Sequence, residues 1–303
     1  MTRRINGVRI PASTSNLGPG FDCLGCALEL YLDVRVAPGE GAHRVSASGV
    51  DCDKMPSGED NLIVKVLNRV AERRARQIDP VSLRVENGVP LARGLGSSAT
   101  AILAGISCYE IAAGDRLSED EILDYAWEFE PHSDNLVAAL LGGLTLPATV
   151  GTSNPVFMKL DVPEGVTPVL VIPDFEVSTR SAREVLPDSY SKSDLVFNIQ
   201  RSALVVGAIA TGRWEFLGEA MRDRVHQPYR AGLVPGLEQV LALKGDGLYG
   251  IALSGAGPTV LALTDPRKCE DVGRRVTEVF STHGVSVRVE TTRIDTVGRR
   301  FLE

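Results

Sequence analysis

A segment rich in glycine and serine, PLARGLGSSA at residues 90–99, has the composition of a loop that binds phosphate. An alternating apolar run at residues 81–85 predicts a half-buried strand before it. The apolar residues 100–113 predict a helix after it, ended by Gly114. Glycine lets the backbone approach an anion closely, and a helix start offers unpaired N–H groups and a positive dipole end. The segment is not a Walker A loop, because no Lys follows the second glycine. An ordinary tight turn is the alternative.

A turn-rich segment, NLGPGFD at residues 16–22, lies between two predicted strands and carries Asn16 and Asp22. Asn and Asp often cap turns locally, which is one interpretation of this pattern. The other is a rigid loop, held by Gly and Pro, that presents a carboxylate to a cation such as an ammonium group. The segment alone leaves both open.

Two carboxylates, Glu128 and Glu130, lie near the end of a helix that the capping box at Ser118 is expected to open. A carboxylate at that end opposes the helix dipole, and a divalent cation would remove the penalty. Mg²⁺ takes one or two protein oxygens together with phosphate oxygens. We therefore expect Glu128 and the Ser98 hydroxyl to hold Mg²⁺; the alternative is that both glutamates are solvated surface residues.

The next helix is expected to begin in the sequence HSDN at residues 132–135. Asp134 as an N-cap is the simpler interpretation of this sequence. Alternatively, His132 and Asn135 face a cleft and hold a substrate hydroxyl. Further along, Thr179 and Arg183 form one group and Arg230 belongs to a second basic group. Arginines from separate segments can bind one carboxylate together, although each alone is more often a solvated side chain.

Length and composition limit the classes of protein. The chain has 303 residues, 44% of them hydrophobic, and a net charge of −7, which disfavours a nucleic-acid partner. Residues 2–7 do not resemble a signal sequence, and the apolar residues 136–150 are interrupted by glycine and proline, so no membrane span is expected. We expect a soluble cytoplasmic protein. The five cysteines include one lone C-x-x-C, Cys23 and Cys26, interpreted as reduced thiols with a redox or metal role as the alternative.

Hydrophobic periodicity predicts an α+β protein. Strands are expected at residues 28–36 and 81–85, and helices at 61–77, 100–113 and from 118 onward. The second half predicts a β-α-β-β-α-β order, with additional helices, in the following segments: strand 168–172, helices 194–212 and 235–244, strands 248–253 and 259–263, helix 269–283 and strand 285–290. A boundary is expected within residues 152–163, which gives domains at 1–160 and 161–303.

Three motifs in order resemble the GHMP kinases: the loop at 16–22, the phosphate loop at 90–99 and the glycine loop at 253–258. The resemblance spans nearly the whole chain. It implies a two-domain GHMP-kinase fold, with an N-terminal domain like ribosomal protein S5 domain 2 and a ferredoxin-like C-terminal domain. It also implies an ATP-dependent kinase, with ATP phosphates on the glycine loop. The nucleotide residues implied are Asn61, Pro90, Leu91, Ala92, Arg93, Gly94, Leu95, Gly96, Ser97, Ser98, Ala99 and Thr100.

Within this family, four segments resemble the homoserine kinases: PASTSNLGPGFDCLG at 11–25, HSDN at 132–135 with LGG at 141–143, TRSAR at 179–183 and HQPYR at 226–230. The resemblance implies phosphorylation of L-homoserine to O-phospho-L-homoserine, a step of threonine biosynthesis, by a homodimer. One departure is Pro131, which stands where a glycine is expected and leaves the role of Glu130 open.

The resemblance also implies roles for particular residues. The substrate carboxylate is expected on Arg183 and Arg230, the ammonium on Asp22 with Asn16, and the hydroxyl on Asn135. His132, Thr179 and Gly257 are expected nearby. Asp134 is the alternative proton acceptor, although a loose phosphoryl-transfer transition state needs little activation of the nucleophile. Three other hypotheses are a GHMP kinase for another small alcohol, an inactive ligand sensor on the same fold and an RNA-binding module.

Overall fold

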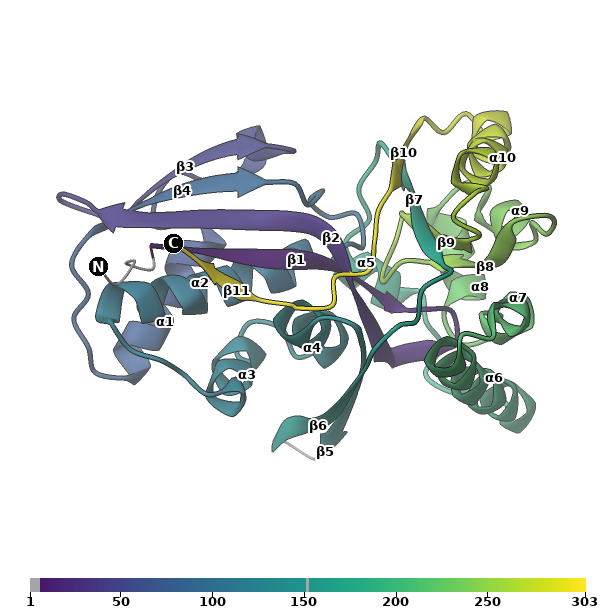
Figure 1. The fold of residues 1–303 in the computed structure, drawn as a ribbon, viewed down its shortest axis with the longest axis horizontal. Helices are drawn as coiled ribbons and strands as arrows, with labels where there is room; N and C mark the ends of the chain where they lie inside the picture. Colours follow the sequence, from purple (N-terminus) through teal and green to yellow (C-terminus); the bar gives the residue numbers. More distant parts are fainter. Residues whose placement is uncertain (1–5, 151–152) are drawn as a thin grey trace.

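Two β-sheets organise the chain into two lobes that meet along one side (Figure 1). The structure is a computed structural model that describes residues 6–150 and 153–303. Residues 2–5, which belong to the expectation that no signal sequence is present, lie outside the described residues, as does Thr152 at the predicted domain boundary.

The N-terminal lobe is built on a seven-stranded sheet with the strand order β11-β1-β2-β4-β3, and β5 and β6 continue it beside β2. Only the β3–β4 pair among these strands is parallel. The strand β4 shows strict alternation of buried and exposed side chains, as its sequence predicts. The strands are β1 (Gly7–Asn16), β2 (Gly20–Pro38), β3 (Arg44–Gly49), β4 (Val81–Asn87), β5 (Leu144–Val150), β6 (Ser153–Leu160) and β11 (Arg300–Leu302).

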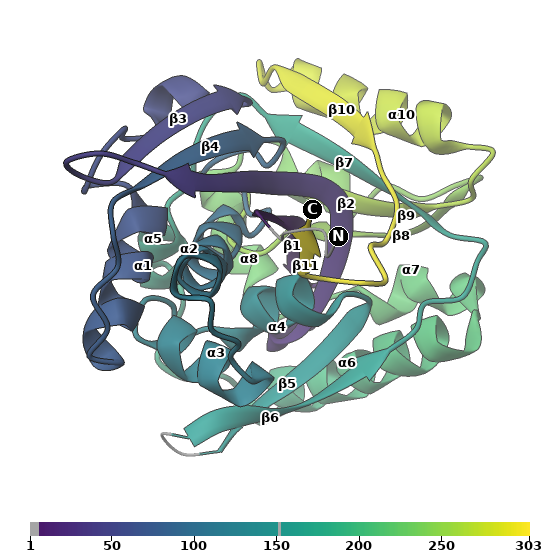
Figure 2. The same ribbon diagram turned by 60° about the vertical axis from the view of Figure 1, so that its left-hand side comes forward.

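Four helices cover one face of this sheet (Figure 2). They are α1 (Leu62–Arg73), α2 (Ser97–Ala113), α3 (Glu119–Trp127) and α4 (Ser133–Leu141). Their ends follow local chemistry: the Asn61 side chain caps α1, the predicted capping box of Ser118 and Glu121 opens α3, and Gly114 in the left-handed conformation ends α2.

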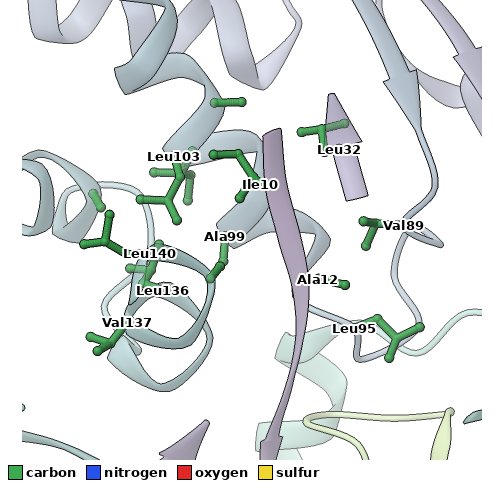
Figure 3. Close-up of a cluster of buried hydrophobic side chains, with 14 of the residues drawn as sticks. Ile10, Ala12, Leu32, Val89, Leu95, Ala99, Leu103, Leu136, Val137 and Leu140 are labelled. Carbon is green, nitrogen blue, oxygen red and sulfur yellow. The ribbon is translucent and has the colours of Figure 1, made fainter. Parts of the chain in front are cut away.

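The core of this lobe lies where β1 passes α2 and α4. Figure 3 shows Leu103 of α2 beside Ile10 of β1, with Leu136 of α4 in the same cluster, and all three side chains are fully buried. Burial of a side chain of this size contributes about 1.5–3 kcal/mol. This packing fixes the starts of α2 and α4 relative to the end of β1.

The C-terminal lobe is an antiparallel sheet in the order β10-β7-β9-β8, with α10 packed against β7. Numbered within the lobe, this order is 4-1-3-2, so the predicted β-α-β-β-α-β pattern and its ferredoxin-like fold are confirmed. The strands are β7 (Thr167–Pro173), β8 (Leu248–Leu253), β9 (Val260–Thr264) and β10 (Val287–Thr291). The helices are α5 (Thr179–Glu184), α6 (Lys192–Thr211), α7 (Leu217–Ala220), α8 (Gln227–Arg230), α9 (Leu237–Leu241) and α10 (Cys269–Thr282).

Several predicted bounds differ from the structure. The helix expected at residues 61–77 ends at Arg73, and α2 begins at Ser97 rather than residue 100, because Gly96 reverses the chain with a φ of 70°. A strict division at residue 160 fails at the C-terminus, because β11 returns to the N-terminal sheet and pairs with β1. Across residues 6–150 and 153–303, no helix combines the length and apolar character needed to cross a membrane.

Candidate active site

A cavity of about 280 Å³ lies at the junction of the lobes and collects most of the residues that the sequence singled out. Its walls come from the end of β1, the start of β2, the phosphate loop, the start of α4, the helices α5 and α8, and the loop between β8 and β9. Figure 1 shows α5 between the two lobes. The predicted site residues that line the cavity are Asn16, Asp22, Ala92, Gly94, Gly96, Ser97, Ser98, Ala99, His132, Asp134, Asn135, Thr179, Arg183 and Arg230.

The phosphate loop ends at the start of α2, where Gly96 occupies the N-cap position without a side-chain cap. The first-turn N–H groups of a helix lack intrahelical partners, so this end offers donors and a positive dipole end to an anion. Space also requires the two glycines: a Cβ on Gly94 would lie 2.1 Å from the carbonyl oxygen of Ser254, and one on Gly96 would lie 2.2 Å from Oγ of Ser13. The Ser254 hydroxyl donates to the carbonyl of Gly94 at 2.6 Å, so the β8–β9 loop braces the phosphate loop.

The Asn135 amide is held by side chains from β1. Oδ1 of Asn135 accepts from the Ser13 hydroxyl at 2.9 Å, and Nδ2 donates to Oγ of Ser15 at 3.0 Å. Nδ2 also lies 3.2 Å from Oδ1 of Asp134. These partners fix which way the amide points at the cavity.

Asp134 is 3% exposed and lies at the second position of α4. The expectation that it is the N-cap is wrong, because His132 occupies that position. Burial raises the pKa of the Asp134 carboxyl group to about 6, and the nearby Asp22 charge adds to the increase. A carboxyl group with this pKa can accept a proton near neutral pH.

Glu130 lines the cavity, whereas Glu128 does not. Oε1 of Glu130 lies 2.5 Å from Nδ1 of His132 and 3.2 Å from its backbone N–H, so the glutamate fixes the imidazole. The carboxylate of Glu128 accepts from Arg69 and Arg73 of α1, each at 2.7 Å. These arginines also lower the pKa of Glu128 against an opposing contribution from burial. The expected pairing of Glu128 with Ser98 therefore lacks support from the cavity, because the carboxylates that line it with Ser98 are Asp22, Glu130 and Asp134.

Opposite charges from the two lobes meet at the other end of the cavity. Nη2 of Arg183, on α5, lies 2.7 Å from Oδ1 of Asp22, on β2, and both side chains are about one-third exposed, at 32% and 37%. Nε of Arg183 is buried and has no hydrogen-bond partner within the described residues. Thr179 precedes Arg183 by one helical turn, so both side chains lie on the same face of α5.

Arg230 is 2% exposed and is held by neutral acceptors. Its Nε donates to the carbonyl of Ala182 at 3.0 Å, and its Nη1 donates to the carbonyl of Gly255 at 2.9 Å. Burial, together with the Arg183 charge, lowers the pKa of the guanidinium to about 10, which leaves Arg230 protonated at neutral pH. The guanidinium groups of Arg183 and Arg230 thus line the same cavity as the Asp22 carboxylate.

Eight residues predicted for the site do not line the cavity, and most have other contacts. Asn61 caps α1, Leu95 lies in the core (Figure 3), and the Thr100 hydroxyl donates to the carbonyl of Ser97. The Arg93 guanidinium donates to the carbonyls of Pro173 and Asp174, which joins the lobes. The full set outside the cavity lining is Asn61, Pro90, Leu91, Arg93, Leu95, Thr100, Glu128 and Gly257.

Sequence reasoning did not assign several residues that line the cavity or support its side chains. Ser13 and Ser15 belong to a predicted strand, and only their alternation in STS at residues 13–15 indicates that both face the same side. Nothing local indicates that Phe21 lies beside the arginines, with the Arg230 Cζ 5.2 Å from its ring centre. The lining residues without an individually assigned role are Ser15, Phe21, Glu130, Val177, Ser178, Gly255 and Ala256.

The cysteines support the expectation of reduced thiols. All five are free. Burial raises the pKa of Cys26 and of Cys108 to about 12, which keeps both thiols protonated. Within the described residues, no group of three or more His, Cys, Asp or Glu side chains is placed to hold a metal ion.

Comparison with known proteins identifies the family of the chain. The family models of the GHMP kinases match the chain at residues 61–143 for the N-terminal domain and 205–282 for the C-terminal domain. A homoserine kinase from a Synechococcus species is 43% identical over 296 residues, which cover 97% of each chain. Another from Desulfitobacterium hafniense is 40% identical and covers 96% of this chain and 98% of its own.

Solved structures give the same result. The crystal structure of homoserine kinase from Cytophaga hutchinsonii superposes with a TM-score of 0.86 at 25% identity and covers 100% of this chain and 98% of its own. A putative homoserine kinase from Listeria monocytogenes gives a TM-score of 0.78 at 27% identity and covers 98% of this chain and 99% of its own. The two-domain GHMP-kinase fold expected from the sequence is confirmed. The chain therefore belongs to the GHMP kinases and, within them, to the homoserine kinases.

Proposed function

We propose that this protein transfers the γ-phosphoryl group of ATP to the side-chain hydroxyl of L-homoserine and releases O-phospho-L-homoserine. The observation that carries this proposal is the composition of one cavity. An anion-binding helix start forms one wall, and a carboxylate with two guanidinium groups forms the other. This arrangement matches a phosphate donor on one side and a zwitterionic amino acid on the other.

We propose that the zwitterion binds by replacing the ion pair between Arg183 and Asp22 with ion pairs to its own carboxylate and ammonium groups. Its carboxylate is bound by Arg230 and by Arg183, whose Nε donor is unpaired, and its ammonium group is bound by Asp22 with Asn16 beside it. The Asn16 side chain is positioned for this role, because its Oδ1 accepts from the backbone N–H of Asp22 at 3.1 Å. An alcohol that has a carboxylate but no ammonium group would attract Arg183 away from Asp22. The Asp22 carboxylate would then be left without a cationic partner.

ATP is proposed to bind with its phosphates along the phosphate loop and the start of α2. Asn61 is proposed on the adenine side, as the family resemblance implies. Mg²⁺ fits the oxygen donors in the cavity, and we propose that the Ser98 hydroxyl and the Glu130 carboxylate hold it. When bound, Mg²⁺ neutralises charge on the phosphate oxygens.

The hydroxyl of homoserine is proposed to lie at Asn135, with His132 and Thr179 beside it. A metaphosphate-like transition state needs alignment and charge neutralisation more than a strong base. The network of Ser13 and Ser15 that fixes the Asn135 amide supports a role in alignment. Asp134, with a pKa of about 6, is the alternative group for accepting the proton.

The test is ATP consumption by the purified protein with Mg²⁺ and one alcohol at a time: L-homoserine, L-serine, L-threonine, mevalonate or shikimate. The proposal predicts a strong preference for L-homoserine that is lost in Arg183→Ala and Arg230→Ala. Turnover of mevalonate or shikimate at a similar rate would contradict the assignment of Asp22. Binding of ATP without turnover of any alcohol would favour the ligand-sensor hypothesis.

We also propose that the protein acts in the cytoplasm and as a homodimer, as the family resemblance implies. Light scattering of the purified protein tests the second part. A mass of about twice the 32.5 kDa of one chain is expected, and a mass equal to one chain would contradict it.

A further inference from the structure

His226 is fully buried beside the substrate end of the cavity and contacts both lobes. It precedes α8 and lies four residues before Arg230. Its Nε2 is 2.7 Å from the carbonyl oxygen of Gly18, and its Nδ1 is 3.0 Å from Nη1 of Arg230. Its ring stacks on Phe21 with the ring centres 5.3 Å apart. A single imidazole therefore joins the β1–β2 loop to a guanidinium of the other lobe.

The partners of His226 determine its tautomer. A guanidinium only donates, so Nδ1 must accept from Arg230 and carry no proton. A carbonyl oxygen only accepts, so Nε2 must carry the proton that it donates to Gly18. The neutral imidazole protonated on Nε2 is the form that satisfies both contacts.

Charged groups face this imidazole from three elements. Arg230 lies on α8, Asp22 lies on β2, and Oδ2 of Asp223, in the loop before α8, is 3.6 Å from Nε2. Both oxygens of Asp223 already accept hydrogen bonds, from the Asn198 side chain and from backbone N–H groups that include that of His226. Burial lowers the pKa of His226, with a further lowering by Arg230 against an opposing effect of Asp223, so the neutral form prevails at neutral pH.

We propose that His226 is a positioning residue that holds the Arg230 guanidinium, through an acceptor on Nδ1, in the orientation that binds the substrate carboxylate. This inference rests on the proposed role of Arg230 in binding L-homoserine. The other acceptors of Arg230, Ala182 and Gly255, are backbone carbonyls. All three partners are thus neutral, and the positive charge of Arg230 remains available to an anionic ligand.

Two matched variants separate the contacts of the imidazole. In His226→Asn the amide oxygen can replace Nδ1 as the acceptor for Arg230, and the donor to Gly18 is lost. In His226→Gln the amide can replace Nε2 as the donor to Gly18, and the acceptor for Arg230 is lost. A hydrogen bond to a charged group is involved, so we expect the KM for L-homoserine to rise about 10-fold or more in His226→Gln and less than about 3-fold in His226→Asn. The KM for ATP should stay within about 2-fold in both.

The pH profile of the unmodified protein supplies a second readout. Protonation of Nδ1 places a donor and a like charge against Arg230. The KM for L-homoserine should therefore rise as the pH falls below the pKa of His226, which burial holds under the ordinary value for His. This rise in KM should be absent in His226→Asn, whereas a fall in kcat from protonation of Asp134 should persist in both proteins. Thermal unfolding of each variant measures any loss of stability separately.

Equal KM values for L-homoserine in the two variants would overturn this inference, as would a parallel rise in the KM for ATP. It would also be overturned if the KM of His226→Asn for L-homoserine still rose at low pH. The failure of the proposed function looks different. In that case the unmodified protein does not turn over L-homoserine, or Arg230→Ala leaves its KM unchanged.

Discussion

The Asp134 carboxyl group is buried at the site, where its ionised form is less stable than in water. Its folded pKa of about 6 exceeds its ordinary value of 3.8 because it is buried beside Asp22. Between about pH 4 and pH 6, the folded protein therefore holds a proton that the unfolded chain has released. The fold gains stability as the pH falls through this window, and above it the ionised carboxylate costs at most about 3 kcal/mol.

We therefore predict that Asp134→Asn unfolds with a higher free energy than the unmodified protein at pH 8. The difference should shrink by about half at pH 5, where the native carboxyl group is mostly protonated. Urea denaturation at the two pH values measures both quantities. A difference that is constant with pH would show that folding does not raise the pKa of this carboxyl group.

The two glutamates after α3 give a matched comparison at the level of single residues. Glu130→Gln should lower kcat at least about 100-fold and raise the Mg²⁺ concentration needed for half-maximal rate, because the cavity loses its charge partner for the metal and the support of His132. Glu128→Gln should change kcat less than about 3-fold, since its partners are the surface residues Arg69 and Arg73. A larger fall of kcat in Glu128→Gln than in Glu130→Gln would indicate that Glu128 is the metal ligand.

The difference between these glutamates shows where sequence reasoning stops. Local signals predicted the capping box at Ser118, the glycine-rich turn before α2 and the helix that begins near Asn135. Whether Glu128 or Glu130 faces the cavity depends on where α3 ends and which neighbour offers cations. The helix ends at Trp127, and α1 presents Arg69 and Arg73 to the first of the two.

At the scale of elements, α2 offers a glycine at each end for comparison. Gly96 and Gly114 both have positive φ, 70° and 67°. A Cβ at Gly96 would lie 2.2 Å from Oγ of Ser13 and 3.2 Å from Oδ1 of Asn135, whereas a Cβ at Gly114 meets nothing within 4 Å. Alanine at either position adds backbone strain of about 1 kcal/mol, and only Gly96→Ala also displaces the residues around Asn135.

We predict that Gly114→Ala lowers the unfolding free energy by about 1 kcal/mol and leaves kcat and the KM for ATP within about 2-fold. Gly96→Ala should lower kcat/KM for ATP at least about 100-fold. Steady-state kinetics with parallel denaturation curves make the comparison. Similar kinetics in both variants would show that the start of α2 does not bind the nucleotide phosphates.

Sequence patterns could not predict which strands and helices pair with elements far away in the chain. Alternation and helical periodicity predicted most strands and helices, and the glycine loop after β8 was placed correctly. The return of β11 to β1 and the packing of α5 between the lobes depend on contacts between residues far apart in the chain. Three residues of β11 carry too little pattern to predict a strand.

At the scale of the molecule, the cavity exists only while the two lobes stay together. Arg93 contributes to this contact, because its buried guanidinium donates to the carbonyls of Pro173 and Asp174 across the junction. Arg93→Ala leaves these carbonyls without their donor and should lower the unfolding free energy by about 2–3 kcal/mol. Arg267→Ala, at an exposed ion pair with Asp265, is the control and should change it by less than about 0.5 kcal/mol. Equal losses of unfolding free energy in the two variants would show that Arg93 does not stabilise the contact between the lobes.

The charge arrangement of the whole cavity is tested most directly by substrate discrimination. We would measure kcat/KM for L-homoserine and for 4-hydroxybutyrate, which lacks the ammonium group, in the unmodified protein, in Asp22→Asn and in the control Asp33→Asn. Asp33 pairs with Arg9 on the same sheet, away from the cavity lining. The account predicts a preference for L-homoserine of at least about 100-fold that falls to about 10-fold or less only in Asp22→Asn. Equal use of both alcohols by the unmodified protein, or an unchanged preference in Asp22→Asn, would contradict it.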